Sequence, residues 1–184
     1  MAEGTIHRRT LKPRVEIVRN IDLRKLAWPS NSQASSGLAG NKEYVDFRGL
    51  EWSDADRILR LEEELVDEID SSNDRYITYE RIIDELYDED EGLLGLDLGV
   101  AGAVASISVV HCIPFTSCNG GFYGGHHREY YPLVGFYARP KVVPLLLEAA
   151  NEADIGLTSE EEVFAYSDNV KNMLSFARSL LRLC

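Results

Sequence analysis

The amino-acid sequence predicts an α+β protein, with a small mixed or antiparallel sheet, helices packed on one face of it, and an acidic helical hairpin. Apolar residues recur at three- and four-residue spacing between residues 53 and 91, the spacing of amphipathic helices. In the C-terminal half, segments rich in β-branched and aromatic residues (112–118, 130–138 and 162–166) alternate with helical patterns. Because 45% of the 184 residues are hydrophobic, the chain can bury a core of its own.

The composition divides the chain into two parts. Residues 1–41 are predicted to form a basic N-terminal arm and linker, because 29–41 is rich in Ser, Gly and Asn and almost uncharged. Residues 42–184 are predicted to form one domain. It comprises an acidic helical hairpin at 53–91 and a sheet-and-helix part at 97–184.

The stretch from Leu98 to about His111 is apolar or small on every side, which is typical of a buried helix. We expect Asp97 to cap the start of this helix, although the β-branched end leaves strand as an alternative. The apolar run Leu93–Val110 barely reaches the length of a membrane span. Asp97 interrupts it and acidic residues precede it, so we expect no membrane helix.

The last third of the chain predicts two further helices and a strand. A helix is expected to begin at Arg139-Pro140 and to stop at Gly156, because proline is tolerated in the first helical turn and glycine commonly follows the last one. A strand is expected at 162–166. Ser167 or Asp168 is expected to cap a final helix that runs to about Cys184.

The net charge of −12 is concentrated in the middle of the chain. Residues 51–100 carry eighteen Asp and Glu against four Lys and Arg. Such a surface repels nucleic acid and favours a basic protein partner, whose contacts we place at the following acidic residues: Glu62, Glu63, Glu64, Asp67 and Glu68. Nucleic acid is expected, if at all, only on the basic arm Arg8–Lys25.

Cysteine and histidine point to a separate site. Two of the three cysteines and three of the four histidines lie in residues 111–127. A strand from Cys112 to Cys118 is about 20 Å long, so these two cysteines cannot bind one ion. The odd number of cysteines, without an apolar leader, predicts free thiols in the cytoplasm.

The loop after this strand supports three alternative functions. Cys118 with His126 or His127 offers two or three zinc ligands, or a thiol nucleophile with its base. The same loop could instead hold a phosphate or nucleotide through residues rich in hydrogen-bonding groups: Thr116, Ser117, Asn119, Gly120, Gly121, His126 and His127. In the structural alternative, the glycines serve a tight turn and the cysteines are buried.

These observations predict a non-enzymatic binding or regulatory protein that docks a basic protein partner through its acidic helices. Its profile (small, acidic, single-domain) is similar to that of immunity- or antitoxin-type proteins, without a motif behind the likeness. The alternative is a small hydrolase or transferase that uses Cys118 with His126 or His127, or a nucleotide- or phosphate-binding protein. No cofactor is expected, with zinc as the alternative.

Overall fold

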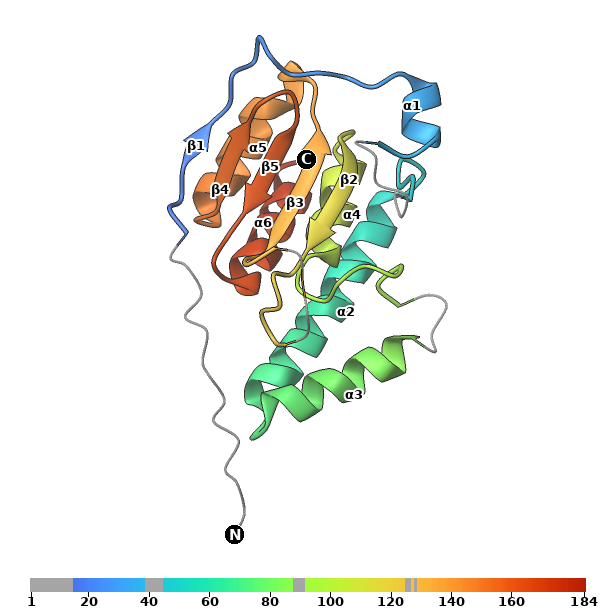
Figure 1. Cartoon of the computed structure of the whole chain (residues 1–184), viewed down its shortest axis with the longest axis vertical. Coiled ribbons are helices and arrows are strands. Elements are labelled where there is room, and N and C mark those ends of the chain that lie inside the picture. The colour runs from blue at the N-terminus through green and yellow to red at the C-terminus, as the bar shows by residue number, and fades with distance from the viewer. Residues whose placement is uncertain (1–14, 39–44, 88–91, 125–126, 128) are drawn as a thin grey trace.

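The computed structural model describes residues 15–38, 45–87, 92–124, 127 and 129–184. It confirms the α+β class, because the described residues form six α-helices and one five-stranded mixed sheet (Figure 1).

The sheet has the strand order β1-β4-β5-β3-β2. β1 pairs with β4 in parallel, and the other neighbours are antiparallel. The strands are β1 (Arg19–Asn20), β2 (Ile113–Cys118), β3 (Leu133–Tyr137), β4 (Gly156–Ser159) and β5 (Val163–Tyr166).

Helices cover one face of this sheet, as predicted (Figure 1). They bury the main core, in which Phe136 of the sheet and Phe176 of the last helix are fully buried. The helices behind the sheet are α4 (Ala101–Val109), α5 (Val143–Glu152, preceded by the 3-10 turn η2, Pro140–Val142) and α6 (Val170–Leu183). In the part of the chain that the structure describes, no helix is both long enough and apolar enough to cross a membrane.

The acidic helical hairpin is also confirmed. It consists of α2 (Trp52–Ser71) and α3 (Arg75–Tyr87), joined by a short turn. α2 packs on both α4 and α6, so the hairpin is attached to the helical layer rather than to the sheet. The predicted acidic end of the hairpin, Asp88–Glu91, lies outside the described residues.

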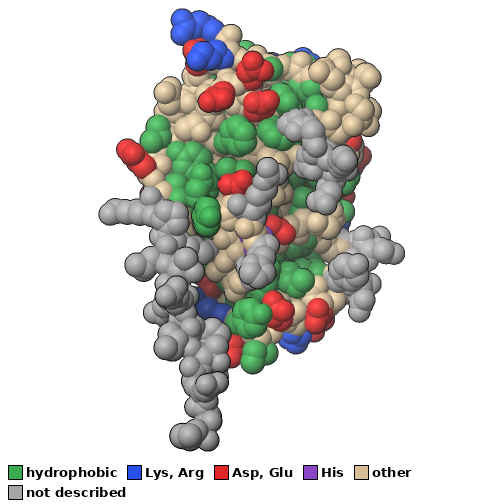
Figure 2. Space-filling view, in the orientation of Figure 1, with side chains coloured by type: hydrophobic (Ala, Val, Ile, Leu, Met, Phe, Trp, Pro, Cys, Tyr) green, Lys and Arg blue, Asp and Glu red, His purple; other side chains and the backbone are tan. Residues whose placement is uncertain are grey.

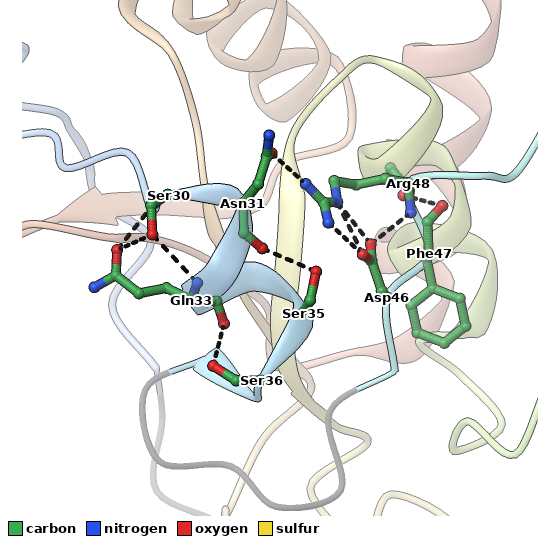
Figure 3. A network of polar contacts seen from close by, with 9 residues as sticks. Ser30, Asn31, Gln33, Ser35, Ser36, Asp46, Phe47 and Arg48 are labelled. Carbon is green, nitrogen blue, oxygen red and sulfur yellow. Dashed lines mark hydrogen bonds and ion pairs between the residues drawn. The ribbon is translucent and has the colours of Figure 1, made fainter.

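The predicted linker at 29–41 is partly wrong, because its first half is ordered by local hydrogen bonds. Helix α1 (Asn31–Ser35) begins with a capping box, in which Ser30 and Gln33 exchange side-chain and backbone hydrogen bonds (Figure 3). Ala34 and Leu38 are buried with Phe115 and Tyr137 on the second face of the sheet. The end of the predicted linker, residues 39–41, lies outside the described residues.

Alternating apolar and charged residues at 14–19, and the residues at 44–48, also predict two short strands. Among the described residues, the first is reduced to β1 (Arg19–Asn20), and residues 45–48 form no strand. On the rest of the second face, hydrophobic side chains gather over β4 and β5 (Figure 2).

The region between α5 and α6 differs from the prediction because a strand was missed. Gly156 does not stop a helix; α5 ends at Glu152, and Asp154 reverses the chain with a positive φ of 52°. Gly156 instead begins β4, where an added Cβ would lie 2.2 Å from the Tyr166 ring. Asn169, not Ser167 or Asp168, caps α6 by accepting the Lys171 N–H at 2.9 Å.

Candidate functional site

The predicted site residues lie where β2 ends and the chain turns towards β3. Asn119 is fully buried, and Gly120 and Gly121 adopt positive φ angles of 67° and 62°. A Cβ on Gly120 would lie 2.4 Å from the backbone of Tyr131. Glycine is therefore needed at Gly120 for both its conformation and its close packing, and the turn folds the following loop back towards Cys118.

Three side chains that could bind a metal converge at this turn. His127 Nδ1 lies 3.5 Å from Cys118 Sγ and 3.5 Å from Asp97 Oδ2. The sulfur, the ring nitrogen and a carboxylate oxygen all lie within 4.8 Å of one another. The predicted proximity of Cys118 and His127 is thus found, and Asp97 joins them, whereas the alternative His126 lies outside the described residues.

Backbone hydrogen bonds fix two of the three side chains. The Gly120 N–H donates to Cys118 Sγ at 3.4 Å, and the Asn119 N–H donates to Asp97 Oδ2 at 3.2 Å. The buried Asn119 side chain also donates to the Leu98 carbonyl at 2.9 Å. The turn after β2 and the turn before α4 are therefore held together, which sets the separation of the sulfur and the carboxylate.

The turn before α4 is held from below by Glu62 of α2. Its fully buried carboxylate accepts N–H groups of Gly99, Ala101 and Gly102 at 2.7, 2.8 and 2.7 Å. The Ala101 and Gly102 N–H groups belong to the first turn of α4, which has no partners for them within the helix, and the Gly99 N–H lies just before that turn. Burial raises the pKa of Glu62 to about 7, although the backbone donors act in the opposite direction.

This arrangement corrects two predictions. Asp97 does not cap α4, which starts at Ala101 with Val100 at the N-cap position; Glu62 satisfies the free N–H groups, and Asp97 faces Cys118 and His127 instead. Glu62 also cannot contact a partner, because its side chain has no exposed surface.

Aromatic side chains border the cluster on the side of the hairpin. Tyr79 of α3 is buried and stacks on Tyr123 of the loop, with ring centroids 5.7 Å apart. Burial raises the pKa of Tyr79, and the charges of Asp97 and Cys118 act in the same direction, while a hydrogen bond with Asn119 lowers it. A protonated phenol therefore stands beside the three candidate ligands at neutral pH.

Two of the predicted ligand-binding residues lie beside the cluster rather than in it. Thr116 and Ser117 line a cavity of about 270 Å³ together with Asp97. A small molecule in this cavity would reach the carboxylate that also contacts His127.

Some of the remaining acidic residues of the predicted docking surface form ion pairs within the protein. Two are engaged in ion pairs within the protein, Glu63 with Arg178 of α6 and Glu68 with Arg81 of α3. Their charge is thereby partly neutralised before any partner arrives. Glu64 and Asp67 remain exposed on α2.

The geometry of the cluster favours metal binding over proton relay. In a relay, a histidine uses one ring nitrogen for the thiol and the other for the carboxylate that orients it. Here Cys118 and Asp97 both approach Nδ1 of His127. Convergence of three donors on one point is the arrangement that an ion requires.

Asp97 is the site residue that the sequence prediction missed. Asp97 lies 21 positions before Cys118 and precedes α4, whereas Cys118 ends β2. In the sequence, an Asp before an apolar run is typical of a helix cap rather than of a metal ligand. Only the packing of α4 against β2 brings it to the sulfur. Comparison of the chain with protein-family models, curated proteins and solved structures found no match.

Proposed function

We propose that this protein binds a divalent transition metal, with zinc the best fit, through Asp97, Cys118 and His127. The observation that carries the proposal is the convergence of one thiol sulfur, one imidazole nitrogen and one carboxylate oxygen within 4.8 Å. These are the three donor types of protein zinc sites.

The spacing of the donors supports this proposal. Zinc lies about 2.3 Å from sulfur and about 2.0–2.2 Å from nitrogen or oxygen, so tetrahedral neighbours are about 3.5 Å apart. Both separations from His127 Nδ1, to Cys118 Sγ and to Asp97 Oδ2, are 3.5 Å. The third separation, from Cys118 Sγ to Asp97 Oδ2, is within 4.8 Å, so binding of an ion would draw the sulfur and the carboxylate to the same tetrahedral spacing.

The surroundings of the Cys118 sulfur and the exposure of His127 and Asp97 are also consistent with metal binding. The Gly120 N–H donates to Cys118 Sγ and so holds the sulfur in place beside His127. The side chains of His127 and Asp97 are 15% and 40% exposed, which leaves an entry path for the ion. Three protein ligands with a fourth position open to water or a small molecule are typical of zinc sites that exchange ligands.

The test is metal content and affinity. We expect the purified protein to carry one zinc ion per chain, and elemental mass spectrometry measures this metal content. Titration of the metal-free chain with Co²⁺ should give the absorption band of a cobalt–thiolate bond. Cys118→Ser, His127→Gln and Asp97→Asn should each weaken binding by at least about 100-fold, since first ligands matter more than their supporting residues. Cys184→Ser, which removes an exposed cysteine elsewhere, is the control.

Metal binding should weaken as the pH falls, because protons compete with the ion for the thiolate, the imidazole and the carboxylate. Metal uptake and cysteine alkylation together separate a metal site from a thiol nucleophile. A chain that takes up no metal, yet whose Cys118 is alkylated faster with His127 present than in His127→Gln, would replace the metal site by an activated thiol.

Docking of a basic protein partner remains a second proposal, on a smaller surface than the sequence predicted. Its support is the pair Glu64 and Asp67, which are exposed on α2, and the exposed apolar side chains of Tyr76 and Ile77 at the start of α3. Exposed acidic and exposed apolar residues on the same helical hairpin suit a partner that offers both basic residues and an apolar contact.

Charge reversal tests this second proposal. A partner recovered in stoichiometric amount from the native host should be lost with Glu64→Lys and Asp67→Lys together. It should be retained with Glu160→Lys, which reverses an exposed charge between β4 and β5. Equal loss in both variants would show that only the net charge matters and would end the case for this surface.

A further inference from the structure

A second cavity, of about 300 Å³, has the opposite charge to most of the molecule. This cavity lies at the start of β2, whereas the candidate metal site lies at the end of β2. A strand of six residues separates the two by roughly 20 Å. Among the described residues, its lining includes four basic or imidazole side chains and no carboxylate. They are Arg48, His111, Arg139 and Lys141.

These side chains come from three separate parts of the fold. Arg48 precedes α2, His111 follows α4, and Arg139 and Lys141 flank the start of η2. His111 adopts a positive φ of 65°, and its N–H donates to the Ser108 carbonyl at 2.9 Å. This left-handed turn ends α4 and places His111 at the rim of the cavity.

Both arginines of the cavity are held in place by neighbours. The Arg139 guanidinium lies over the Trp28 ring, 4.3 Å from its centroid. Arg48 binds the carboxylate of Asp46 and donates to the Asn31 side chain at 3.0 Å (Figure 3). Asp46 offsets the charge of Arg48, so the excess positive charge of the cavity comes from Arg139, Lys141 and, when protonated, His111.

His111, Arg139 and Lys141 are exposed residues around this cavity, and like charges gathered there repel each other even though water screens part of the repulsion. In a chain with a net charge of −12, carboxylates are abundant enough to neutralise such a cavity, yet none lines it. An anion from outside would relieve this repulsion, and arginine suits the planar oxygens of carboxylate or phosphate.

We propose that this cavity binds a small organic anion through a phosphate or carboxylate group. Its volume is at the small end of the usual range for sites of small molecules. Buried Cys112 and Ile113 form apolar lining, and the partly exposed Trp28 ring offers a flat apolar surface. The ligand is therefore expected to combine an oxyanion with a compact apolar or planar body.

Equilibrium dialysis of the full-length chain with labelled pyrophosphate and labelled citrate tests this proposal. Both probes also chelate metals, so the chain is first stripped with EDTA and dialysed, and failure of this site is then independent of the metal proposal. Sodium chloride at matched ionic strength sets the non-specific background. The phosphate and carboxylate probes together show which oxyanion is preferred.

We expect saturable binding of one probe molecule per chain. Arg139→Gln with Lys141→Gln should raise its Kd at least about 10-fold, since each charge-assisted hydrogen bond contributes more than about 1 kcal/mol. Arg60→Gln is the matched control, because this exposed arginine lies on α2 away from the cavity. In a Trp52→Phe background, where Trp28 is the single indole, Trp28 fluorescence should change on binding.

Two results would overturn the proposal. One is the absence of saturable binding of both probes above the chloride background. The other is an equal loss of affinity in Arg60→Gln and in the double variant, which would show that net charge alone attracts the probes.

Discussion

At the scale of single residues, the most consequential side chain is Glu62. It was predicted to meet a partner on the surface, yet it is buried and connects α2 to the turn that carries Asp97. A lone buried carboxylate is costly unless its oxygens receive hydrogen bonds. Here three backbone N–H groups supply them, so Glu62 supports the candidate metal site without touching it.

The raised pKa of Glu62 predicts the pH dependence of stability. Between about pH 4.5 and 7, native Glu62 holds a proton that the unfolded chain has released. The contribution of Glu62 to the unfolding free energy is therefore largest at low pH and falls as the pH rises through this window, in total by on the order of 3 kcal/mol. Urea unfolding at several pH values, for the wild type and for Glu62→Gln, measures it.

The variant isolates this one group from the other carboxyls. We expect Glu62→Gln to remove the fall in stability between pH 5 and 7 and to be less stable than the wild type at pH 5. If both proteins show the same slope against pH, the proton is not taken up by Glu62.

Cysteine reactivity gives a second test at this scale. Burial raises the pKa of Cys112 to about 12, so its thiol is both shielded and protonated, whereas Cys184 is exposed. We expect iodoacetamide to label Cys184 first and Cys112 only after unfolding. Added zinc should protect Cys118 from labelling, and removal of the zinc with EDTA should make Cys118 reactive again. Mass spectrometry of the peptides gives the three rates, and rapid labelling of native Cys112 would contradict the packing described for β2.

At the scale of elements, the start of α4 shows that close packing can outweigh helix propensity. Gly102 lies inside a helix, where alanine would normally be more favourable by about 1 kcal/mol. A Cβ at this position would lie 2.8 Å from both Glu62 Oε2 and Leu59 Cδ1. The small residues of α4 therefore allow α2 to approach closely.

This contact predicts the sign of a substitution. Gly102→Ala should destabilise the protein by about 1–3 kcal/mol, because the added methyl group overpacks the contact between α2 and α4. Gly49→Ala is the control, since its Cβ would meet nothing within 4 Å, and we expect a change within about 0.5 kcal/mol. Thermal or urea unfolding measures both, and a stabilised Gly102→Ala would refute the close approach.

At the scale of the whole molecule, residues 16–20 near the N-terminus belong to the fold. β1 extends the sheet, and the Leu157 N–H of β4 donates to the Val18 carbonyl at 2.8 Å. The Tyr166 hydroxyl of β5 accepts the Val18 N–H at 3.2 Å and donates to the Glu16 carbonyl at 3.1 Å. One side chain thus anchors residues about 150 positions earlier in the chain.

Removing that hydroxyl should loosen this segment alone. Tyr166→Phe keeps the ring but loses both hydrogen bonds, so we expect the Val18 amide to exchange its hydrogen at least about 10-fold faster. Amides of β3 should keep their protection. Hydrogen exchange by NMR measures this difference, and an unchanged rate at Val18 would show that β4 alone holds β1.

The parts of the structure that could be predicted from the sequence are those specified locally. The amphipathic pattern of α2 and the composition of β2, β3 and β5 gave correct elements, and Cys118 and His127 were predicted together because they are nine residues apart. Asp97 could not be assigned, because its role depends on contact between two elements. β1 and β4 were missed or misplaced because strands of two and four residues carry little periodicity.

The two edges of the sheet bear on how the protein behaves at high concentration. An open edge strand can template strands of other copies and so begin aggregation. β1 is only two residues long, and β2 at the other edge carries Pro114, which has no N–H, and a break in register between Pro114 and Thr116. Within the described residues, neither edge therefore presents a long regular ladder to a neighbouring chain, which should lower the tendency to aggregate through the sheet.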